Sequence, residues 1–143
     1  MACAALPMCA LSFAEAERYQ PALISKLEEA IIENGLRDES IVMRMTGCPN
    51  GCARPYIAEI GFVGKAPGTY NMYLGASHAG DRLSKLFKEN LNEEQILAYL
   101  NPMFADFAKT KKNGEKFGDW CIRTGLVKAT VRGSDFHENL GDV

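Results

Sequence analysis

The chain has 143 residues, with 16 basic and 18 acidic side chains and a formal net charge of -2. This length suffices for one ordinary hydrophobic core and is short for two, so we expect a single domain over residues 1–143. The slightly acidic balance and the scattered lysines and arginines argue against nucleic-acid binding, and the absence of a long apolar run argues against a membrane span.

The N-terminal residues lack the basic start and uninterrupted apolar stretch of a secretion signal. Five cysteines are too few for a small disulfide scaffold, and five cannot all pair within one chain. We therefore expect a cytoplasmic protein whose thiols stay reduced.

An irregular loop and then a helix are predicted at the start of the chain. Residues 13–19 have helical composition, Pro21 suits a first helical turn, and apolar side chains recur with a helical period from Leu23 to Ile31. We expect this apolar stripe to face the core.

Three extended segments follow. Residues 41–46 place the isoleucine and methionines at odd positions on one face, as in a strand. Two further strands are predicted near residues 57–64 and 69–75, on either side of a Pro-Gly turn.

The next segments are predicted to be helical. Residues 83–87 carry a short apolar face, and Asn92 with Gln95 resembles a capping box that starts another helix. Pro102 is expected to interrupt that helix, so that a new one begins with Asn101 as its cap.

A last strand through Trp120 and Ile122 is predicted near the C-terminus, with no regular structure beyond Lys128. Together the elements predict an α+β fold: a mixed β-sheet of about four or five strands with helices packed on one face. His78 and His137 have no sequence neighbour that suggests catalysis, so we expect loop or surface roles for them.

Four of the cysteines form two pairs: Cys3 with Cys9, and Cys48 with Cys52. The second pair stands in Gly-Cys-Pro-Asn-Gly-Cys, which suits an iron–sulfur cluster because glycines let the backbone wrap closely and amides can reach the inorganic sulfurs. Thiolates are also soft donors that suit iron.

Other interpretations of the four thiols remain open. A tetrahedral zinc site is possible, although five residues between the first two ligands is an unusual spacing. A thiol–disulfide switch would favour a Cys-x2-Cys pair at a helix start, and buried unreactive cysteines are the simplest alternative. Cys121, alone beside Trp120, is interpreted as a core residue.

Residues 46–55, Thr-Gly-Cys-Pro-Asn-Gly-Cys-Ala-Arg-Pro, resemble the siroheme and iron–sulfur signature of assimilatory sulfite and nitrite reductases. Residues 2–9 and 14–18 look like the other cysteine half-site of that family. The resemblance continues through residues 58–68 and 117–119, and it most resembles the hemoprotein (beta) subunits of NADPH-type sulfite reductases.

The resemblance implies roles for individual residues. Cys3, Cys9, Cys48 and Cys52 match the four ligands of a 4Fe-4S cluster, and Cys52 matches the thiolate that also ligates the siroheme iron. We expect Asn50 near the siroheme. Arg54 is equally compatible with a siroheme carboxylate and with a structural ion pair.

The implied activity is the six-electron reduction of sulfite to sulfide in sulfur assimilation, with electrons from a flavoprotein reductase subunit. A siroheme nitrite reductase domain, a cluster-only electron carrier and a zinc-stabilised module are the alternatives. Family members bind their anionic substrate through basic residues in the N-terminal half of the enzyme, and no segment here matches that half. We therefore expect a fragment that needs the N-terminal half as a partner and is inactive alone.

Overall fold

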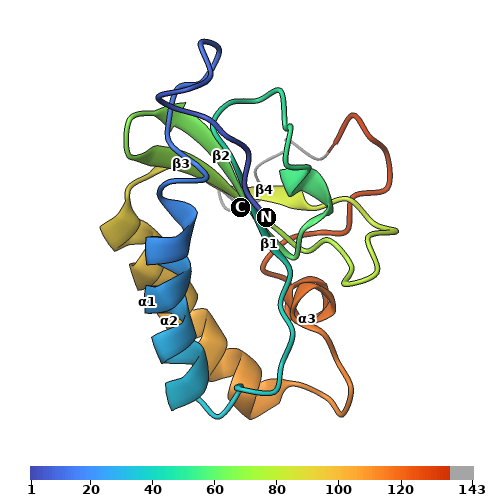
Figure 1. The fold of residues 1–143 in the computed structure, drawn as a ribbon. Helices are drawn as coiled ribbons and strands as arrows, with labels where there is room; N and C mark the ends of the chain where they lie inside the picture. Colours follow the sequence, from blue (N-terminus) through green and yellow to red (C-terminus); the bar gives the residue numbers. More distant parts are fainter. Residues whose placement is uncertain (136–143) are drawn as a thin grey trace.

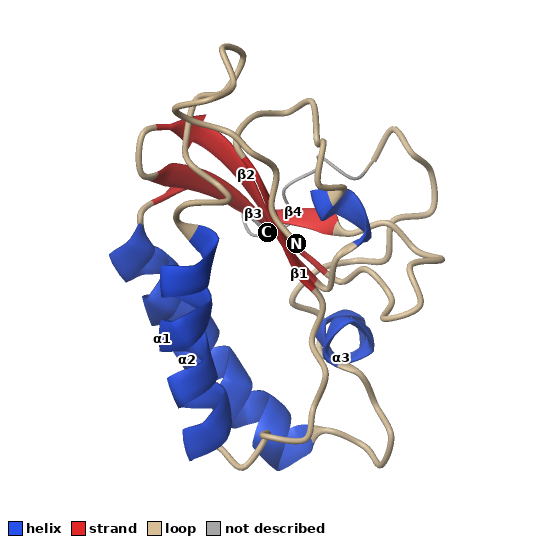
Figure 2. Ribbon diagram, in the orientation of Figure 1, coloured by secondary structure: helices blue, strands red, loops and turns tan. Residues whose placement is uncertain are grey.

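The computed structural model describes residues 1–135 and is built around a four-stranded mixed sheet (Figures 1 and 2). Its strands, in spatial order, are β1 (Met43–Thr46), β2 (Ile60–Ala66), β3 (Thr69–Leu74) and β4 (Lys85–Leu91). β1 is parallel to β2, whereas β2 with β3 and β3 with β4 are antiparallel. The helices are α1 (Gln20–Glu33), α2 (Glu93–Thr110) and α3 (Phe117–Arg123), with a short 3-10 helix η1 (Pro55–Ile57).

One face of the sheet shares the main hydrophobic core with all three α-helices. Side chains from each layer are buried in this core: Phe62, Met72 and Leu74 from the sheet, and Leu27, Phe104 and Phe117 from the helices. The opposite face carries a small separate cluster, Val63, Tyr73 and Leu86, against which Tyr56 of η1 packs. The predicted α+β class with helices on one face of a mixed sheet is confirmed.

Helix α1 follows the predicted apolar stripe. Leu23, Leu27 and Ala30 are buried on one side of it, and Pro21 occupies the first turn. The helix does not include residues 13–19, which were expected to be helical. They instead form turns and bends whose amides bond to other segments, including Phe13 N and Ala14 N to Gly47 O.

Two elements differ in type from their predictions. Residues 85–91 form strand β4, because the edge of β3 is available for pairing and Leu86 and Phe87 reach opposite faces, as successive strand residues do. Residues 117–123 form helix α3, since Phe117, Trp120 and Cys121 repeat at helical spacing and enter the same core. The sheet accordingly has no strand near residue 120 within the described chain.

Helix α2 begins with the predicted capping box, in which Asn92 and Gln95 exchange side-chain and backbone hydrogen bonds. The expected interruption at Pro102 is wrong, because α2 runs through the proline to Thr110. A proline inside a helix is unfavourable by about 3 kcal/mol. The burial of side chains on both sides of Pro102, from Ile96 to Phe107, offsets this cost.

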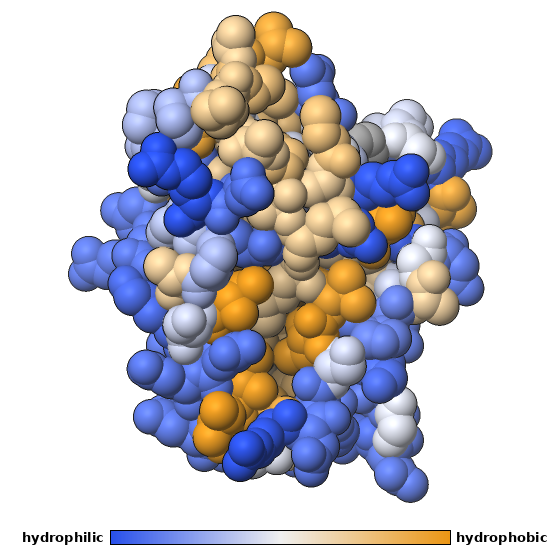
Figure 3. Space-filling view, viewed as in Figure 1, coloured by the Kyte–Doolittle hydropathy of each residue, from blue (hydrophilic) through white to orange (hydrophobic). Residues whose placement is uncertain are grey.

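Residues 128–135 contain turns and no helix or strand, as predicted, and the remaining tail with His137 lies outside the described residues. In the described chain, none of the helices combines the length and apolar character needed to cross a membrane. Hydrophobic side chains gather in a hollow on the face seen in Figure 3.

Candidate functional site

The two cysteine loops, residues 3–9 and residues 47–52, follow neighbouring extended segments. Residues 1–3 run alongside β1 in the parallel sense, with Ala2 paired to Met45 and Cys3 N donating to Met45 O at 3.1 Å. Helix α1 connects the two segments, so together they form a short β-α-β unit. Parallel segments end at the same edge of a sheet, which is why Cys3 and Cys48 emerge side by side.

Gly47 forms hydrogen bonds through both its amide and its carbonyl, to the first cysteine loop and to the segment that follows that loop. Its amide donates to the sulfur of Cys3 at 3.3 Å, and the hydroxyl of Thr46 donates to the same sulfur at 3.4 Å. The Gly47 carbonyl accepts from Phe13 N at 2.9 Å and from Ala14 N at 3.2 Å. Amide donors to a ligating sulfur tune its basicity and hold its orientation, so this contact suits a thiolate ligand.

The position of Gly47 leaves no space for a side chain. A Cβ there would lie 2.6 Å from Ala5 Cβ and 2.7 Å from Ala14 O, and it would overlap Ser12 Oγ. From the sheet side, a Cβ on Gly64 of β2 would overlap the Gly47 carbonyl oxygen. The two cysteine loops and the sheet are therefore in direct contact at Gly47.

The second cysteine loop is shaped by its own backbone bonds. Gly51 N donates to Cys48 O at 3.3 Å, and Arg54 N donates to Gly51 O at 2.8 Å. Gly51 and Arg54 both have positive φ, of 68° and 54°, which suits glycine and strains arginine. The phenol of Tyr56 donates to Pro49 O at 3.2 Å and ties the loop to η1.

Tyr56 lies between this loop and the face of the sheet opposite the main core. Its ring meets the ring of Tyr73 edge-on, with centroids 5.2 Å apart. Burial, and secondarily the nearby Cys48 thiol, raise the pKa of Tyr56 above its ordinary value. The phenol therefore stays protonated and keeps donating to the loop. Nothing in the sequence indicated this role for Tyr56.

The thiols differ in accessibility. Cys48 is buried, Cys3 and Cys9 are half-buried, and Cys52 and Asn50 are exposed. All of the cysteines, which lie within residues 1–135, carry free thiols. Within that range, no three His, Cys, Asp or Glu side chains are grouped so that they could hold a metal ion. The fold thus joins the two loops without gathering their thiols into one group.

Cys121 lies apart from these loops in the main core, on α3, and is fully buried. Burial, followed by the field of Glu59, raises the pKa of the Cys121 thiol. Cys121 is therefore a core thiol with little tendency to ionise, as its apolar surroundings in the sequence indicated.

Glu59 is a buried carboxylate that sequence reasoning missed. Its side chain is completely buried, and it accepts from Val42 N at 3.1 Å and from Gly118 N at 2.8 Å. It also lies 2.7 Å from Nδ1 of His78, which is one-third exposed. The carboxylate therefore links the start of β1, the start of α3 and the loop after β3. His78 lies in this loop and is partly exposed, as expected, and it has a structural partner in Glu59.

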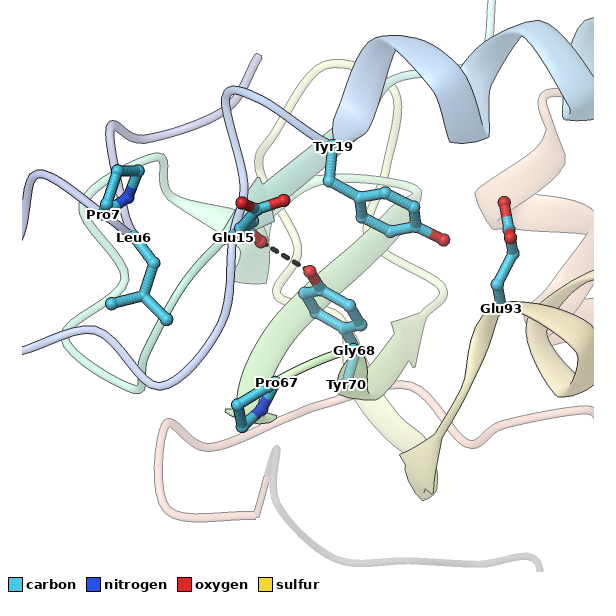
Figure 4. A pocket seen from close by; sticks show the side chains of 8 residues that line it. All are labelled: Leu6, Pro7, Glu15, Tyr19, Pro67, Gly68, Tyr70 and Glu93. Carbon is cyan, nitrogen blue, oxygen red and sulfur yellow. Dashed lines mark hydrogen bonds between the residues drawn. The ribbon is translucent and has the colours of Figure 1, made fainter.

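A pocket of about 540 Å³ adjoins the first cysteine loop (Figure 4). Leu6 and Pro7 of that loop form one side, and the stacked rings of Tyr19 and Tyr70 form its floor, with centroids 5.6 Å apart. Tyr70 donates to the carbonyl of Glu15 at 2.6 Å.

Burial is the main reason that the pKa values of Tyr19 and Tyr70 are raised, and the Glu93 carboxylate adds to the shift of Tyr19. Both phenols are therefore neutral at ordinary pH. The Glu93 carboxylate at the rim is bound by Lys26 at 2.8 Å. This pocket offers apolar contact and hydrogen bonding beside the first cysteine loop rather than a nucleophile or an acid–base pair.

Comparison with known proteins gives consistent relatives, although no family model matches the chain. It is 60% identical over 138 residues to the sulfite reductase [NADPH] hemoprotein beta-component of Bacillus velezensis, covering 96% of this chain and 24% of that protein. The proteins of the same name from Oceanobacillus iheyensis and Methylobacterium nodulans are 58% and 55% identical, over 100% and 99% of this chain and 25% and 23% of their own lengths. The chain therefore spans about a quarter of the curated relatives it matches.

A solved structure is also similar. The NirA protein of Mycobacterium tuberculosis superposes with a TM-score of 0.71 at 28% identity, over 88% of this chain and 25% of that one. The shared fold again corresponds to one quarter of a longer polypeptide.

Proposed function

We propose that the chain belongs to the family of sulfite reductase hemoprotein beta-components and that it supplies the cysteine-bearing quarter of an enzyme that reduces sulfite to sulfide. The observation that supports this most strongly is the identity of 58% with the Oceanobacillus iheyensis relative over 100% of this chain, which includes both cysteine loops. The hydrogen bond from the Gly47 amide to the Cys3 sulfur, which joins the two loops, agrees with a shared role for them.

In this proposal Cys3, Cys9, Cys48 and Cys52 hold a 4Fe-4S cluster. The fit rests on the donors themselves: four free thiols on two adjoining loops are soft ligands of the kind iron–sulfur clusters use. The amide of Gly47 already points at one of these sulfurs. The thiols are not yet grouped as a metal site, so binding requires some of their side chains to move.

Cys52 is the proposed ligand shared between the cluster and a siroheme, and Asn50 lies two residues before it in the exposed part of the loop. Both residues are open to an approaching macrocycle, unlike the buried Cys48. When bound, the cluster and siroheme would supply the electron relay that a six-electron reduction of sulfite requires. The contribution of this chain is to hold the thiols and to fix the loops through Gly47 and Tyr56.

The proposed partners are the remaining three quarters of the polypeptide and a flavoprotein that delivers electrons from NADPH. The relatives carry NADPH in their names and are about four times as long as this chain, which supports both partners. The basic groups that bind sulfite would come from the absent part. We therefore expect the 143-residue chain alone to show no sulfite reduction.

The longer protein tests the proposal. After anaerobic purification, it should contain iron and acid-labile sulfide and should show siroheme absorption, and it should reduce sulfite with an artificial low-potential electron donor. Cys3→Ser and Cys48→Ser should each lower the iron content to background. Cys121→Ala, the control, removes the fifth cysteine of this 143-residue part and should leave the iron content unchanged. Stoichiometric zinc without iron in the wild-type protein would overturn the assignment.

A further inference from the structure

A groove of about 520 Å³ lies between α1 and the segment that leads into β1, in the hydrophobic hollow of Figure 3. Its apolar lining consists of Met1, Ile24, Ile31, Ile32, Ile41 and Met43. Ile32 is 55% exposed and Met1 is 66% exposed, so large hydrophobic side chains face solvent here. The charged side chains of Glu28, Arg37 and Glu39 complete the lining. Exposed apolar side chains with charged groups around them fit a surface that another polypeptide segment covers.

Along one edge of this groove, the backbone groups of residues 41 and 43 point away from β2 and are placed to pair with another strand. Val42 O accepts from Ile60 N at 3.1 Å, so the backbone groups of Val42 point toward β2. Strand residues alternate, and Met43 therefore points toward the opposite edge, where its carbonyl accepts from the Met1 ammonium at 3.1 Å. The amide of Met43 and the carbonyl of Ile41 point to the same edge by this alternation.

Residues 1–3 already show how a segment uses this edge. Met45 N donates to Met1 O at 3.0 Å, and Cys3 N donates to Met45 O at 3.1 Å, which is the bond pattern of a parallel strand. The pairing reaches only as far as Met43. A strand longer by two residues, continuing in the same register, would bring a carbonyl to Met43 N and an amide to Ile41 O.

We propose that an extended segment of the longer protein adds to this edge as a strand parallel to β1 and covers the apolar groove. The occupant is a part of the same polypeptide because the chain spans only a quarter of its relatives and because the existing pairing places Met1 at the mouth of the groove. The inference rests on the proposed function only in requiring a longer polypeptide. Strand addition of this kind gains main-chain hydrogen bonds together with apolar contact.

Amide hydrogen exchange tests the pairing directly. In the 143-residue chain Met43 N should exchange quickly, and in the longer protein at least tenfold more slowly. The amides of α3, which lies away from the groove, serve as the internal reference. Equal exchange of Met43 in the two proteins would overturn the proposal. If light scattering found that the 143-residue chain self-associates and that this protects Met43, a second copy would be the occupant and the proposal would be wrong.

Two exposed apolar residues provide a matched pair of variants. Ile32→Glu places a charge in the groove, whereas Val131→Glu does so at a residue that is 85% exposed and does not line it. Neither should change the melting temperature of the 143-residue chain. In the longer protein Ile32→Glu should speed the exchange of Met43 at least tenfold and Val131→Glu should not. An unchanged exchange rate in Ile32→Glu would refute the covered groove.

The readouts separate this inference from the proposed function. Iron, labile sulfide and siroheme report on the function, and Met43 exchange reports on the strand. A longer protein with a protected Met43 but no iron would support the strand and overturn the function. A cofactor-loaded protein in which the Met43 amide is unprotected would support the function and overturn the strand.

Discussion

The amide of Gly47 donates a hydrogen bond to the sulfur of Cys3 across 3.3 Å, linking residues from the two cysteine loops. The two loops can approach closely enough for this bond because residue 47 has no side chain. A Cβ at this position would collide with Ala5, Ser12 and Ala14. The glycine therefore serves the site by its small size as much as by its amide.

Gly47→Ala should destabilise the chain and separate the two loops. The added Cβ would meet Ala14 O at 2.7 Å as well as Ala5 Cβ, and overpacking of this kind costs about 1–3 kcal/mol. Urea denaturation measures the loss. Gly133→Ala is the control, because nothing lies within 4 Å of a Cβ there, and it should change stability little. Equal stability of the two variants would contradict the close contact at Gly47.

Glu59→Gln should weaken the joint between β1, α3 and the loop after β3. The carboxylate accepts from Val42 N, Gly118 N and His78, whereas a glutamine has one acceptor oxygen and would turn an NH2 group toward a donor. Unsatisfied buried groups cost about 1–3 kcal/mol each, so we expect a loss of about 2 kcal/mol or more in chemical denaturation.

Asp119→Asn is the control for the Glu59 variant. It removes the Asp119 charge from an ion pair with Arg82 in which the aspartate side chain is 48% exposed, and such pairs contribute about 0–1 kcal/mol. A larger loss of unfolding free energy for Asp119→Asn than for Glu59→Gln would show that the Glu59 carboxylate does not link β1, α3 and the loop after β3.

Two asparagines distinguish the observed continuous helix α2, which begins after its cap Asn92 as predicted, from the predicted interruption with a new helix capped by Asn101. Asn92→Ala removes the capping box and should destabilise the chain by about 1 kcal/mol. Asn101→Ala changes an exposed residue inside the helix, where alanine is the better helix former, so stability should be equal or slightly higher. Thermal unfolding of both variants checks this. A loss at Asn101 instead would indicate a helix start at Pro102.

The five thiols should differ in their reaction with iodoacetamide in the metal-free 143-residue chain. Cys52 is exposed and should be labelled first, whereas Cys121 is buried with a raised pKa and should be labelled only after unfolding. Mass spectrometry of the labelled peptides, with and without denaturant, measures the order. Rapid labelling of Cys121 in the folded chain would contradict its place in the core.

Local signals in the sequence predicted much of the fold. The stripe of α1 and the Asn92–Gln95 box are each written in a few adjacent residues, and each was confirmed. The strand predicted over residues 41–46 is found over 43–46, with Ile41, Met43 and Met45 packed in the main core as the alternation predicted. The predictions failed where distant partners decide the structure. Residues 85–91 are a strand because β3 pairs with them, and α2 passes Pro102 because its buried face continues beyond it.

For the candidate site, the sequence identified the cysteines but not what positions them. The parallel pairing of Ala2 with Met45 and the tether from Tyr56 to Pro49 depend on contacts between segments that no local pattern encodes. Glu59 was missed for a related reason. A glutamate next to an apolar strand normally faces water, and only the fold surrounds this one with amides and an imidazole.

The pairing of residues 1–3 with β1 also bears on the order of events in folding. β2 and β3 are joined by a tight turn, whereas Cys3 and Thr46 are 43 positions apart in the chain. Contacts between distant positions require a larger loss of chain entropy and form later than local ones. We expect the hairpin to form first and the cysteine loops to meet among the last contacts. During synthesis the thiols would be apart, and under the proposed function the newly made chain would be most vulnerable to oxidation before it could receive iron.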